Sequence, residues 1–213
     1  FDAARAFAYQ CKYETFTEDA DSRSCIPGWH ERFLEIISAE LKRSIALPIL
    51  VIGAGVGDEA KRIWRQFGTD TLLSDVSDGL VENCMRQAPY ADLRVGVAED
   101  LSDIRSQSIG SYIALRTLES MFLDKMATLK EAYRVLKVGG MIAISISCAY
   151  NENGILQKGR FVSANERDLA GGSEEVLDIL RNMESVGLCP LRIYDLETEW
   201  LIIGERPRRP SSS

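Results

Sequence analysis

Histidine is almost absent from the sequence, and its cysteines are few and scattered. His30 is the single histidine, which excludes a metal centre built from several imidazoles. The five cysteines include no close pair, so neither a zinc site nor a redox motif is indicated. Isolated cysteines of this kind usually behave as small, buried or half-buried apolar residues in a reducing compartment. We therefore expect a cytoplasmic protein without a metal.

Long apolar runs and an excess of basic residues are also missing. No stretch approaches the roughly 20 apolar residues that span a bilayer, and no signal peptide is visible, so we expect no membrane partner. Lysine and arginine number 25 against 32 acidic residues, a net charge of −7. Because nucleic-acid affinity depends mainly on neutralising phosphates, we expect no nucleic-acid partner either. The one dense basic run, "RPRRP", stands beside "SSS" and indicates a solvated tail over residues 206–213.

The sequence does contain enough apolar material for one large domain. Its 213 residues are 46% hydrophobic, which suffices for a full core at this length. We expect a single domain over residues 1–213, with no linker inside it. Residues 1–43 read as a weak amphipathic helix, a polar loop and a stronger helix, which indicates a helical cap. The α/β core then spans residues 44–205.

Short apolar runs alternate with amphipathic segments from Ser44 onward. Strands are predicted at 48–53, 71–77, 93–101, 110–118 and 139–147, and helices at 58–68, 78–88, 126–137 and 173–188. The last two apolar runs, "PLRIYDL" and "EWLIIGERP", stand a few residues apart and predict an antiparallel hairpin. This alternation indicates a doubly wound, mostly parallel sheet with helices on both faces.

The segment "LVIGAGVGD" at residues 50–58 places glycine at every second position between a strand and a helix. Such a turn bends tightly or brings the backbone close to a ligand. The dinucleotide fingerprint G-x-G-x-x-G needs a glycine where this chain has Asp58. Negative charge there disfavours a pyrophosphate. A nicotinamide-dependent oxidoreductase is therefore disfavoured, and a zwitterionic or cationic ligand suits the turn better.

Asp75 supports a nucleoside ligand. It ends the second predicted strand, about twenty residues after the glycine turn, where an acid can accept hydrogen bonds from both ribose hydroxyls. The alternative is a helix N-cap. Ser77 or Asp78 can serve as that cap equally well, so we favour the ribose role for Asp75.

Five segments together resemble a known family. They are "VIGAGVGDEA", "LLSDVSDGLVENC", "VGVAEDLS", "RTLESM" and "LKEAYRVLKVGGMIAISI", and they stand in the order and spacing of a class I S-adenosylmethionine-dependent methyltransferase. The chain is most similar to the small single-domain group that acts on metabolites. The resemblance implies a Rossmann-like sheet of seven strands in the order 3-2-1-4-5-7-6, the last strand antiparallel. It also implies S-adenosylmethionine as cofactor and methyl transfer to an O, N or C atom of a small molecule, by a monomer or homodimer.

The resemblance assigns cofactor-binding roles to eight residues. The turn would lie under the methionine part, the acid would bind the ribose, and the remaining residues would contact the adenine or flank the methionine moiety. The turn would consist of Gly53, Ala54 and Gly55, and the acid would be Asp75. The residues at the adenine would be Val76, Ala98 and Glu99, and Leu115 would flank the methionine moiety.

Two acids that are common in the family are missing here. One would stand two residues before the first glycine, where this chain has Val51, and the other would contact the adenine amino group at the position of Val97. Glu99 or Asp100 would replace the second contact, or the affinity for the cofactor would be lower.

Three residues are candidates for the catalytic, acceptor-side chemistry. Arg116 follows the fourth predicted strand, and a buried guanidinium there needs an anionic partner from the cofactor, the substrate or an internal acid. His30 titrates near neutrality when free, so it is either a general base or a solvated residue at a helix start. Glu119 is likewise either a site residue or a solvated one. The long stretch 148–172 is expected to cover the pocket.

Other functions remain open on the sequence. The segment "SRSCIPGWHERFLEII" resembles the cap of the synthase that makes carboxy-S-adenosylmethionine, which would keep the cofactor and change the reaction. A pseudo-enzyme or scaffold that binds the nucleoside without turnover is a further alternative. Val51 and Val97 favour it, and the intact glycine turn and Asp75 oppose it.

Overall fold

The computed structural model describes only part of the 213 residues. The described ranges are 35–36, 38–40, 42–43, 47–54, 58–68, 70–76, 81–82, 85–86, 92–118, 123–150, 156–158, 173–195 and 199–208. Most of the expected cap lies outside these ranges, and so do His30, Gly55 and Glu119. Within these ranges, no helix is both long enough and apolar enough to cross a membrane.

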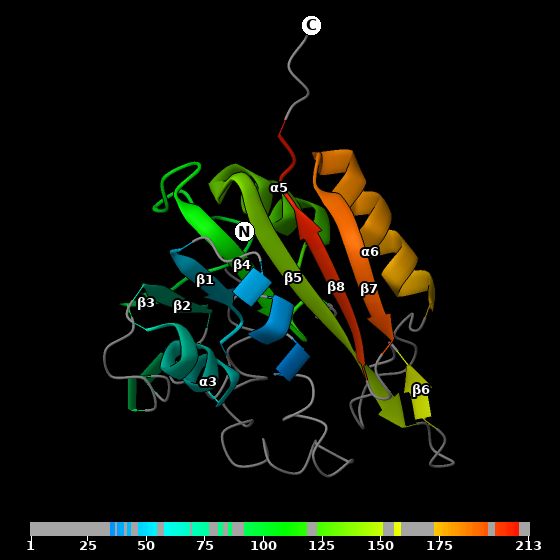
Figure 1. Cartoon of the computed structure of the whole chain (residues 1–213), viewed down its shortest axis with the longest axis horizontal. Coiled ribbons are helices and arrows are strands. Elements are labelled where there is room, and N and C mark those ends of the chain that lie inside the picture. Colours follow the sequence, from blue (N-terminus) through cyan, green and yellow to red (C-terminus); the bar gives the residue numbers. More distant parts are fainter. Residues whose placement is uncertain are drawn as a thin grey trace, which may run out of the picture.

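Within the described residues, a mixed sheet of eight strands forms the centre of the molecule (Figure 1). The strands are β1 Ile49–Ile52, β2 Thr71–Asp75, β3 Asp92–Val95, β4 Ile109–Leu115, β5 Leu136–Tyr150, β6 Leu156–Lys158, β7 Cys189–Asp195 and β8 Glu199–Glu205. The main path is β3-β2-β1-β4-β5-β8-β7, and β6 pairs with the end of β5. Neighbours from β3 to β5 are parallel, whereas β8 is antiparallel to β5 and β7. With β6 left out of the count, this is the predicted order 3-2-1-4-5-7-6, so the fold prediction is confirmed.

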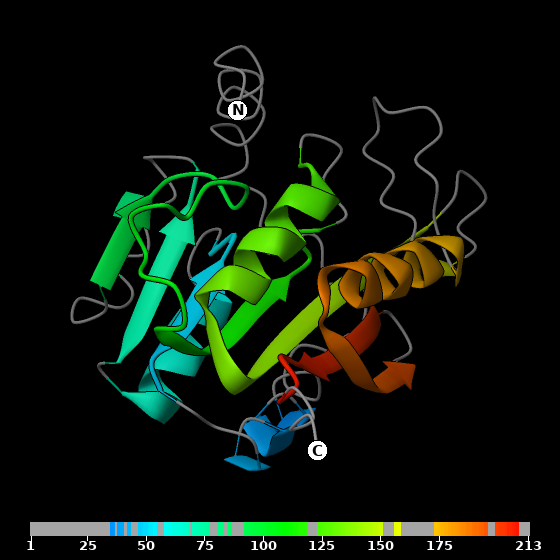
Figure 2. The ribbon, with the colours of Figure 1, turned by 90° about the horizontal axis from the view of Figure 1, so that it is seen from above.

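Helices cover both faces of this sheet (Figure 2). The labelled helices are α3 Asp58–Phe67, α5 Lys125–Val135 and α6 Ser173–Val186. β1 reads ILVI, and all of its side chains are buried. Because side chains alternate along a strand, Leu50 joins the core beneath α5 and α6, whereas Val51 joins the core beneath α3. One continuous apolar run therefore contributes to two cores.

The third strand is shorter than its apolar pattern predicts. The prediction extends to residue 101, but β3 ends at Val95. The chain turns there, and the Gly96 N–H donates to the Asp75 carbonyl oxygen at 2.8 Å. Leu101 is nevertheless completely buried. Apolar residues of the following loop fill the core, and this extends the strand-like pattern beyond the strand.

The fourth strand and the stretch after the fifth also differ from prediction. β4 ends at Leu115 rather than residue 118, because Arg116 adopts a left-handed backbone with a φ of 51°. β5 continues to Tyr150, and its end pairs with the short strand β6. The sequence pattern misses β6, because three paired residues are too few to show an alternation.

The described end of the cap packs on the sheet. Its helical residues lie on the α3 side, where Ile36 packs against the core (Figures 1 and 2). Glu40 is 1% exposed and accepts hydrogen bonds from Arg192 and Tyr194 of β7. Arg43 donates to it at 3.0 Å. Burial raises the pKa of Glu40, but these hydrogen bonds and charges outweigh burial, so the pKa lies below its ordinary value.

β7 forms the edge of the main sheet path, and its first residue corrects an expectation. Cys189 is exposed and forms no disulfide, although the cysteines are expected to be buried or half-buried. An edge strand leaves one side of its residues without a neighbour, so composition alone does not reveal this exposure.

Candidate functional site

A cleft opens at the carboxyl ends of β1 to β4, where the strand order reverses around β1 and β4. Ligands bind at this position in open α/β sheets. The cleft holds about 380 Å³ of space that no atom occupies, and part of this space is open to solvent. Its lining comes from residues 52–53, 74–76, 96–99, Thr117 and Leu123. All but Leu123 stand within four residues of the carboxyl end of a strand.

The turn after β1 depends on Gly53. Its φ of 66° lies in the left-handed region, which favours glycine. A Cβ at this position would lie 2.3 Å from the Thr117 Oγ1. The Thr117 hydroxyl is 3.2 Å from the carbonyl oxygen of Ile52 and 2.9 Å from that of Leu115. Both the backbone conformation and the close packing of β1 against β4 therefore require glycine here.

Asp75 lines the cleft at the end of β2 and is 3% exposed. The backbone carbonyl groups at this strand end bond to the segments that follow β1 and β3. The Ser74 carbonyl oxygen accepts from the Ala54 N–H at 3.1 Å, and the Asp75 carbonyl oxygen accepts from the Gly96 N–H. An ionised carboxylate offers acceptor oxygens only. This position therefore suits a ligand that presents hydroxyl groups.

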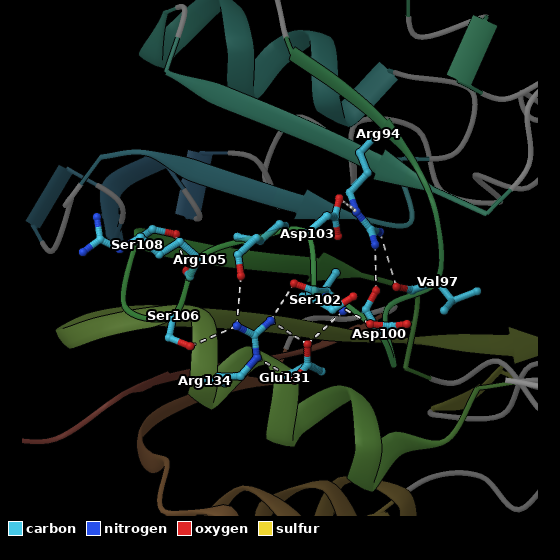
Figure 3. A network of polar contacts seen from close by, with 12 residues as sticks. Arg94, Val97, Asp100, Ser102, Asp103, Arg105, Ser106, Ser108, Glu131 and Arg134 are labelled. Carbon is cyan, nitrogen blue, oxygen red and sulfur yellow. Dashed lines mark hydrogen bonds and ion pairs between the residues drawn. The ribbon is translucent and has the colours of Figure 1, made fainter.

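The outer part of the loop after β3 is held by α5 (Figure 3). Arg134 donates to the carbonyl oxygen of Leu101 at 2.6 Å and to that of Ile104 at 2.9 Å. Glu131 accepts from the Leu101 N–H at 2.8 Å and pairs with Arg134 at 2.7 Å. The hydrogen bond from Arg134 holds the pKa of Glu131 below its ordinary value, despite partial burial.

The inner part of the same loop is held by Arg94 of β3 (Figure 3). Its Nη2 donates to the Asp100 carbonyl oxygen at 2.7 Å, and its Nε donates to the Asp103 carboxylate at 2.7 Å. Its Nη1 lies 3.2 Å from the Ser74 Oγ and 3.4 Å from the Val97 carbonyl oxygen. The hydrogen bond from Arg94 holds the pKa of Asp103 below its ordinary value, despite partial desolvation.

Glu99 connects the cleft wall to the start of α5. Its Oε1 accepts from the Asp124 N–H at 2.9 Å. Asp124 is the N-cap of α5, and its side chain accepts from the Ala127 N–H at 2.9 Å. The carboxylate of Glu99 therefore has a structural contact in addition to any contact with a ligand.

Arg116 stands at a strained position directly after β4. Its φ of 51° is left-handed, and strain of this kind at a residue other than glycine clusters at functional sites. Its N–H lies 3.0 Å from the Ser145 Oγ and 3.2 Å from the Ser145 carbonyl oxygen. The residue is half-buried. The neighbouring strand β5 therefore holds its backbone in place.

The structure brings most of the expected cofactor residues to one place. Ala54 is buried beside the turn. Leu115 does not line the cleft, because its side chain packs into the core on the α3 face. The expected cofactor residues that do line the cleft are Gly53, Asp75, Val76, Ala98 and Glu99.

Sequence reasoning missed Ser74 and Arg94, and it named Thr117 only as a candidate on the substrate side, without its contact with Gly53. Thr117 and Ser74 line the cleft, but single hydroxyl residues next to strand ends carry little signal. Arg94 leaves a clearer one, because it is a basic residue inside the strand "DLRV" and stands two positions before a glycine. Residues at this spacing point to the same face of a strand.

The cleft lies in the part of the chain that matches a known family. Residues 50–144 match the family described as a methyltransferase domain. This part of the chain is therefore a methyltransferase domain. No curated protein sequence matches it significantly.

Solved structures share the fold of this methyltransferase at low identity. A TehB-like SAM-dependent methyltransferase from Corynebacterium glutamicum is 18% identical with a TM-score of 0.59, over 97% of this chain and 100% of that one. Geranyl diphosphate C-methyltransferase from Streptomyces coelicolor A3(2), in complex with Mg²⁺, geranyl diphosphate and S-adenosyl-L-homocysteine, is 17% identical with a TM-score of 0.59, over 83% and 80%. The [4+2]-cyclase SpnF is 15% identical with a TM-score of 0.65, over 83% and 80%. These similarities concern the fold.

The cleft is suited to S-adenosylmethionine, on which the TehB-like neighbour depends. The buried acid Asp75 suits the ribose hydroxyls, and the apolar side chains of Val76, Ala98 and Leu123 suit a flat base. The missing Cβ at Gly53 leaves the backbone open to a close approach. In the described parts of the chain, no group of three or more metal-ligating side chains is present.

Proposed function

We propose that the methyltransferase transfers a methyl group from S-adenosylmethionine to an O, N or C atom of a small-molecule acceptor. One observation carries the proposal. The Gly53 turn and the Asp75 carboxylate meet in a single cleft, within the residues that match the methyltransferase family. When bound, the cofactor supplies a methyl group on a sulfonium, which is already an excellent leaving group.

Each part of the cleft has a proposed task in holding the cofactor. The turn formed by residues 53–55 holds the methionine part, and Asp75 accepts hydrogen bonds from the ribose hydroxyls. Val76 packs on the adenine, and Ala98 and Glu99 lie along its edge. Leu115 supports the methionine side from the core on the α3 face, which its side chain joins.

The acceptor side is proposed to work mainly through alignment and exclusion of water. Arg116 orients an anionic group of the acceptor or the cofactor from its fixed position after β4. His30 and Glu119 are proposed as further catalytic residues, with His30 as the general base if the nucleophile must lose a proton. The cap, residues 1–43, closes over the acceptor on the 44–205 core. The tail expected over 206–213 begins only after Arg206, because Arg206 donates to the carbonyl oxygens of Tyr133 and Leu136.

The proposed setting of the protein follows from its composition. A net charge of −7 supports a protein that acts without a nucleic-acid partner. We place it in the cytoplasm, away from the membrane, as a monomer or homodimer of single-domain chains. The geranyl diphosphate methyltransferase of the same fold supports a small-molecule acceptor.

The second candidate is a protein that binds the cofactor without transferring a methyl group. SpnF favours it, because a [4+2]-cyclase shares the fold. Val97 also favours it, because this apolar residue lines the cleft at the position where many relatives carry an acid.

Two measurements test the proposal and separate the candidates. S-adenosylhomocysteine should raise the melting temperature, with a stabilisation of about 2.7 kcal/mol at about 100 times its dissociation constant. Incubation with methyl-labelled cofactor and a metabolite pool should then give a labelled product, detected by mass spectrometry. No shift at millimolar ligand would exclude the cofactor, whereas a shift without any labelled product would support the second candidate.

A further inference from the structure

The Arg94 guanidinium lies beneath the loop that forms one wall of the cleft (Figure 3). Its side chain is 12% exposed. It contacts the carbonyl oxygens of Val97 and Asp100, at 3.4 Å and 2.7 Å, from inside the loop. A guanidinium presents its donors in a fixed fork. Arg94 therefore fixes the orientation of two peptide groups at once.

Gly96 leaves the space that this guanidinium occupies. A Cβ on Gly96 would lie 2.4 Å from the Arg94 Nη1. The φ of Gly96 is not in the left-handed region, so the backbone itself does not require glycine. The contact with Arg94 is therefore the reason for glycine at this position.

Because the carbonyl oxygens of these two peptide groups are fixed, the directions of their N–H groups are fixed as well. In a planar trans peptide, the N–H points opposite to the carbonyl oxygen of the same group. The Asp100–Leu101 peptide shows this arrangement, because its oxygen faces Arg94 and the Leu101 N–H bonds to Glu131 at 2.8 Å.

The same geometry turns the Ala98 N–H away from Arg94. Ala98 is 6% exposed and lines the cleft. Among the described residues, its N–H has no hydrogen-bond partner. A nearly buried donor without a partner is costly, so a ligand that brings an acceptor to it is favoured.

From this geometry we infer that Arg94 is a positioning residue for base recognition. By holding the 97–100 backbone, it presents a donor at Ala98 to an acceptor nitrogen of the purine. Adenine carries an acceptor at its N1, whereas hypoxanthine carries a hydrogen there. The inference rests on the proposed function and predicts that Arg94 controls the preference for S-adenosylhomocysteine over its hypoxanthine analogue, S-inosylhomocysteine.

Titration calorimetry with these two compounds tests the inference. The wild-type protein should prefer S-adenosylhomocysteine by roughly tenfold or more. Arg94→Met should weaken S-adenosylhomocysteine by up to roughly tenfold, because the neutral hydrogen bond from the Ala98 N–H is lost, and should leave S-inosylhomocysteine nearly unchanged. Arg94→Lys should recover only part of the preference, because an ammonium cannot hold two carbonyls in a fixed fork.

Gly96→Ala provides a second variant that keeps the arginine. The new methyl group displaces the guanidinium, which is the end of a flexible side chain. The fold should survive, and the preference should fall as it does in Arg94→Met. In the double variant, Gly96→Ala should have little further effect, because both changes remove the same contact.

Arg206→Met is the matched control. Arg206 also donates to backbone carbonyls, those of Tyr133 and Leu136 at 2.9 Å each, at the end of α5 and away from the cleft lining. This variant should lower the melting temperature and keep the wild-type preference.

The outcomes separate this inference from the proposed function. If Arg94→Met and Gly96→Ala both keep the wild-type preference, even at lower melting temperatures, this inference is wrong and Arg94 is a structural residue. The proposed function is not affected by that result. If Arg94→Met does not fold, Gly96→Ala decides by the same criterion. Failure of the wild-type protein to bind S-adenosylhomocysteine would overturn the proposed function and this inference together.

Discussion

Glu40 and Asp75 are both almost completely buried acids, at 1% and 3% exposure, yet their surroundings differ. Glu40 lies between the end of the cap and β7, and Arg192, Tyr194 and Arg43 donate to it. Asp75 lies at the carboxyl end of β2 and lines a cleft of about 380 Å³. Protein donors surround the first acid, whereas the second belongs to the lining of a cleft.

The comparison shows that burial of an acid does not by itself indicate function. Burial of a charge is costly in either place unless other groups compensate. At Glu40 the protein supplies that compensation and gains an attachment between distant segments. At Asp75 a ligand with hydroxyl groups finds a strong acceptor. The cleft beside Asp75 distinguishes the two cases.

The largest effect on ligand affinity is expected from Asp75→Asn, which tests the ligand side of the comparison. Loss of the ionised acceptor should weaken S-adenosylhomocysteine by about 1.5–3 kcal/mol, the value of a hydrogen bond to a charged group. The melting temperature without ligand should change little, because asparagine keeps the shape. Calorimetry and thermal denaturation measure the two quantities. Unchanged affinity would remove Asp75 from the ribose site.

Glu40→Ala tests the structural side and should show the opposite pattern. It leaves Arg192 and Tyr194 without their acceptor, at a cost of about 2–3 kcal/mol in the free energy of unfolding. The cost stays moderate because the Arg192 side chain is 43% exposed and can regain water. Urea denaturation measures the loss, and affinity for S-adenosylhomocysteine should stay constant. Glu35→Ala, at an exposed position of the same helical segment, is the control without effect.

Gly53→Ala sharpens the comparison at the cleft itself. A left-handed backbone costs an alanine about 1–2 kcal/mol, and its methyl group would also displace Thr117. Gly68 has a φ of 82° with no atom within 4 Å of an added Cβ, so Gly68→Ala reports the backbone cost alone. Only the Gly53 variant should also lose cofactor affinity. Equal behaviour of the two variants in denaturation and binding would contradict the role of the Thr117 contact.

The smallest effect is expected in the free energy of unfolding at acid pH. The pKa of Glu40 in the folded protein lies below its ordinary value of 4.5. An acid of this kind stabilises the fold above its ordinary pKa, and this stabilisation is lost as the pH falls through the folded value. Urea denaturation from about pH 7 to about pH 3 should therefore show a steeper loss for the wild type than for Glu40→Gln. Parallel curves would show that Glu40 does not contribute.

The sequence predicts the parts of this molecule that depend on neighbouring residues in the chain. The apolar runs locate the strands, and the position of Gly53 and Asp75 at strand ends locates the cleft. The role of Arg94 and the contact of Thr117 with the end of β1 escape prediction, because they depend on segments that only the fold brings near. Leu115 is placed in the cleft by resemblance, but the alternation of side chains turns it into the core. The contact of Glu99 with Asp124 is likewise a product of the tertiary structure.

The close approach of Gly53 and Thr117 also constrains how this chain and its relatives can diverge. The two positions share one small space, since a Cβ on Gly53 would lie 2.3 Å from the Thr117 Oγ1 and 2.8 Å from its Cγ2. A larger residue at position 53 becomes tolerable only after position 117 has lost its branched side chain, and that step also removes the hydroxyl between the ends of β1 and β4. Substitutions at the two positions should therefore occur together in an alignment, with the change at 117 first along a lineage.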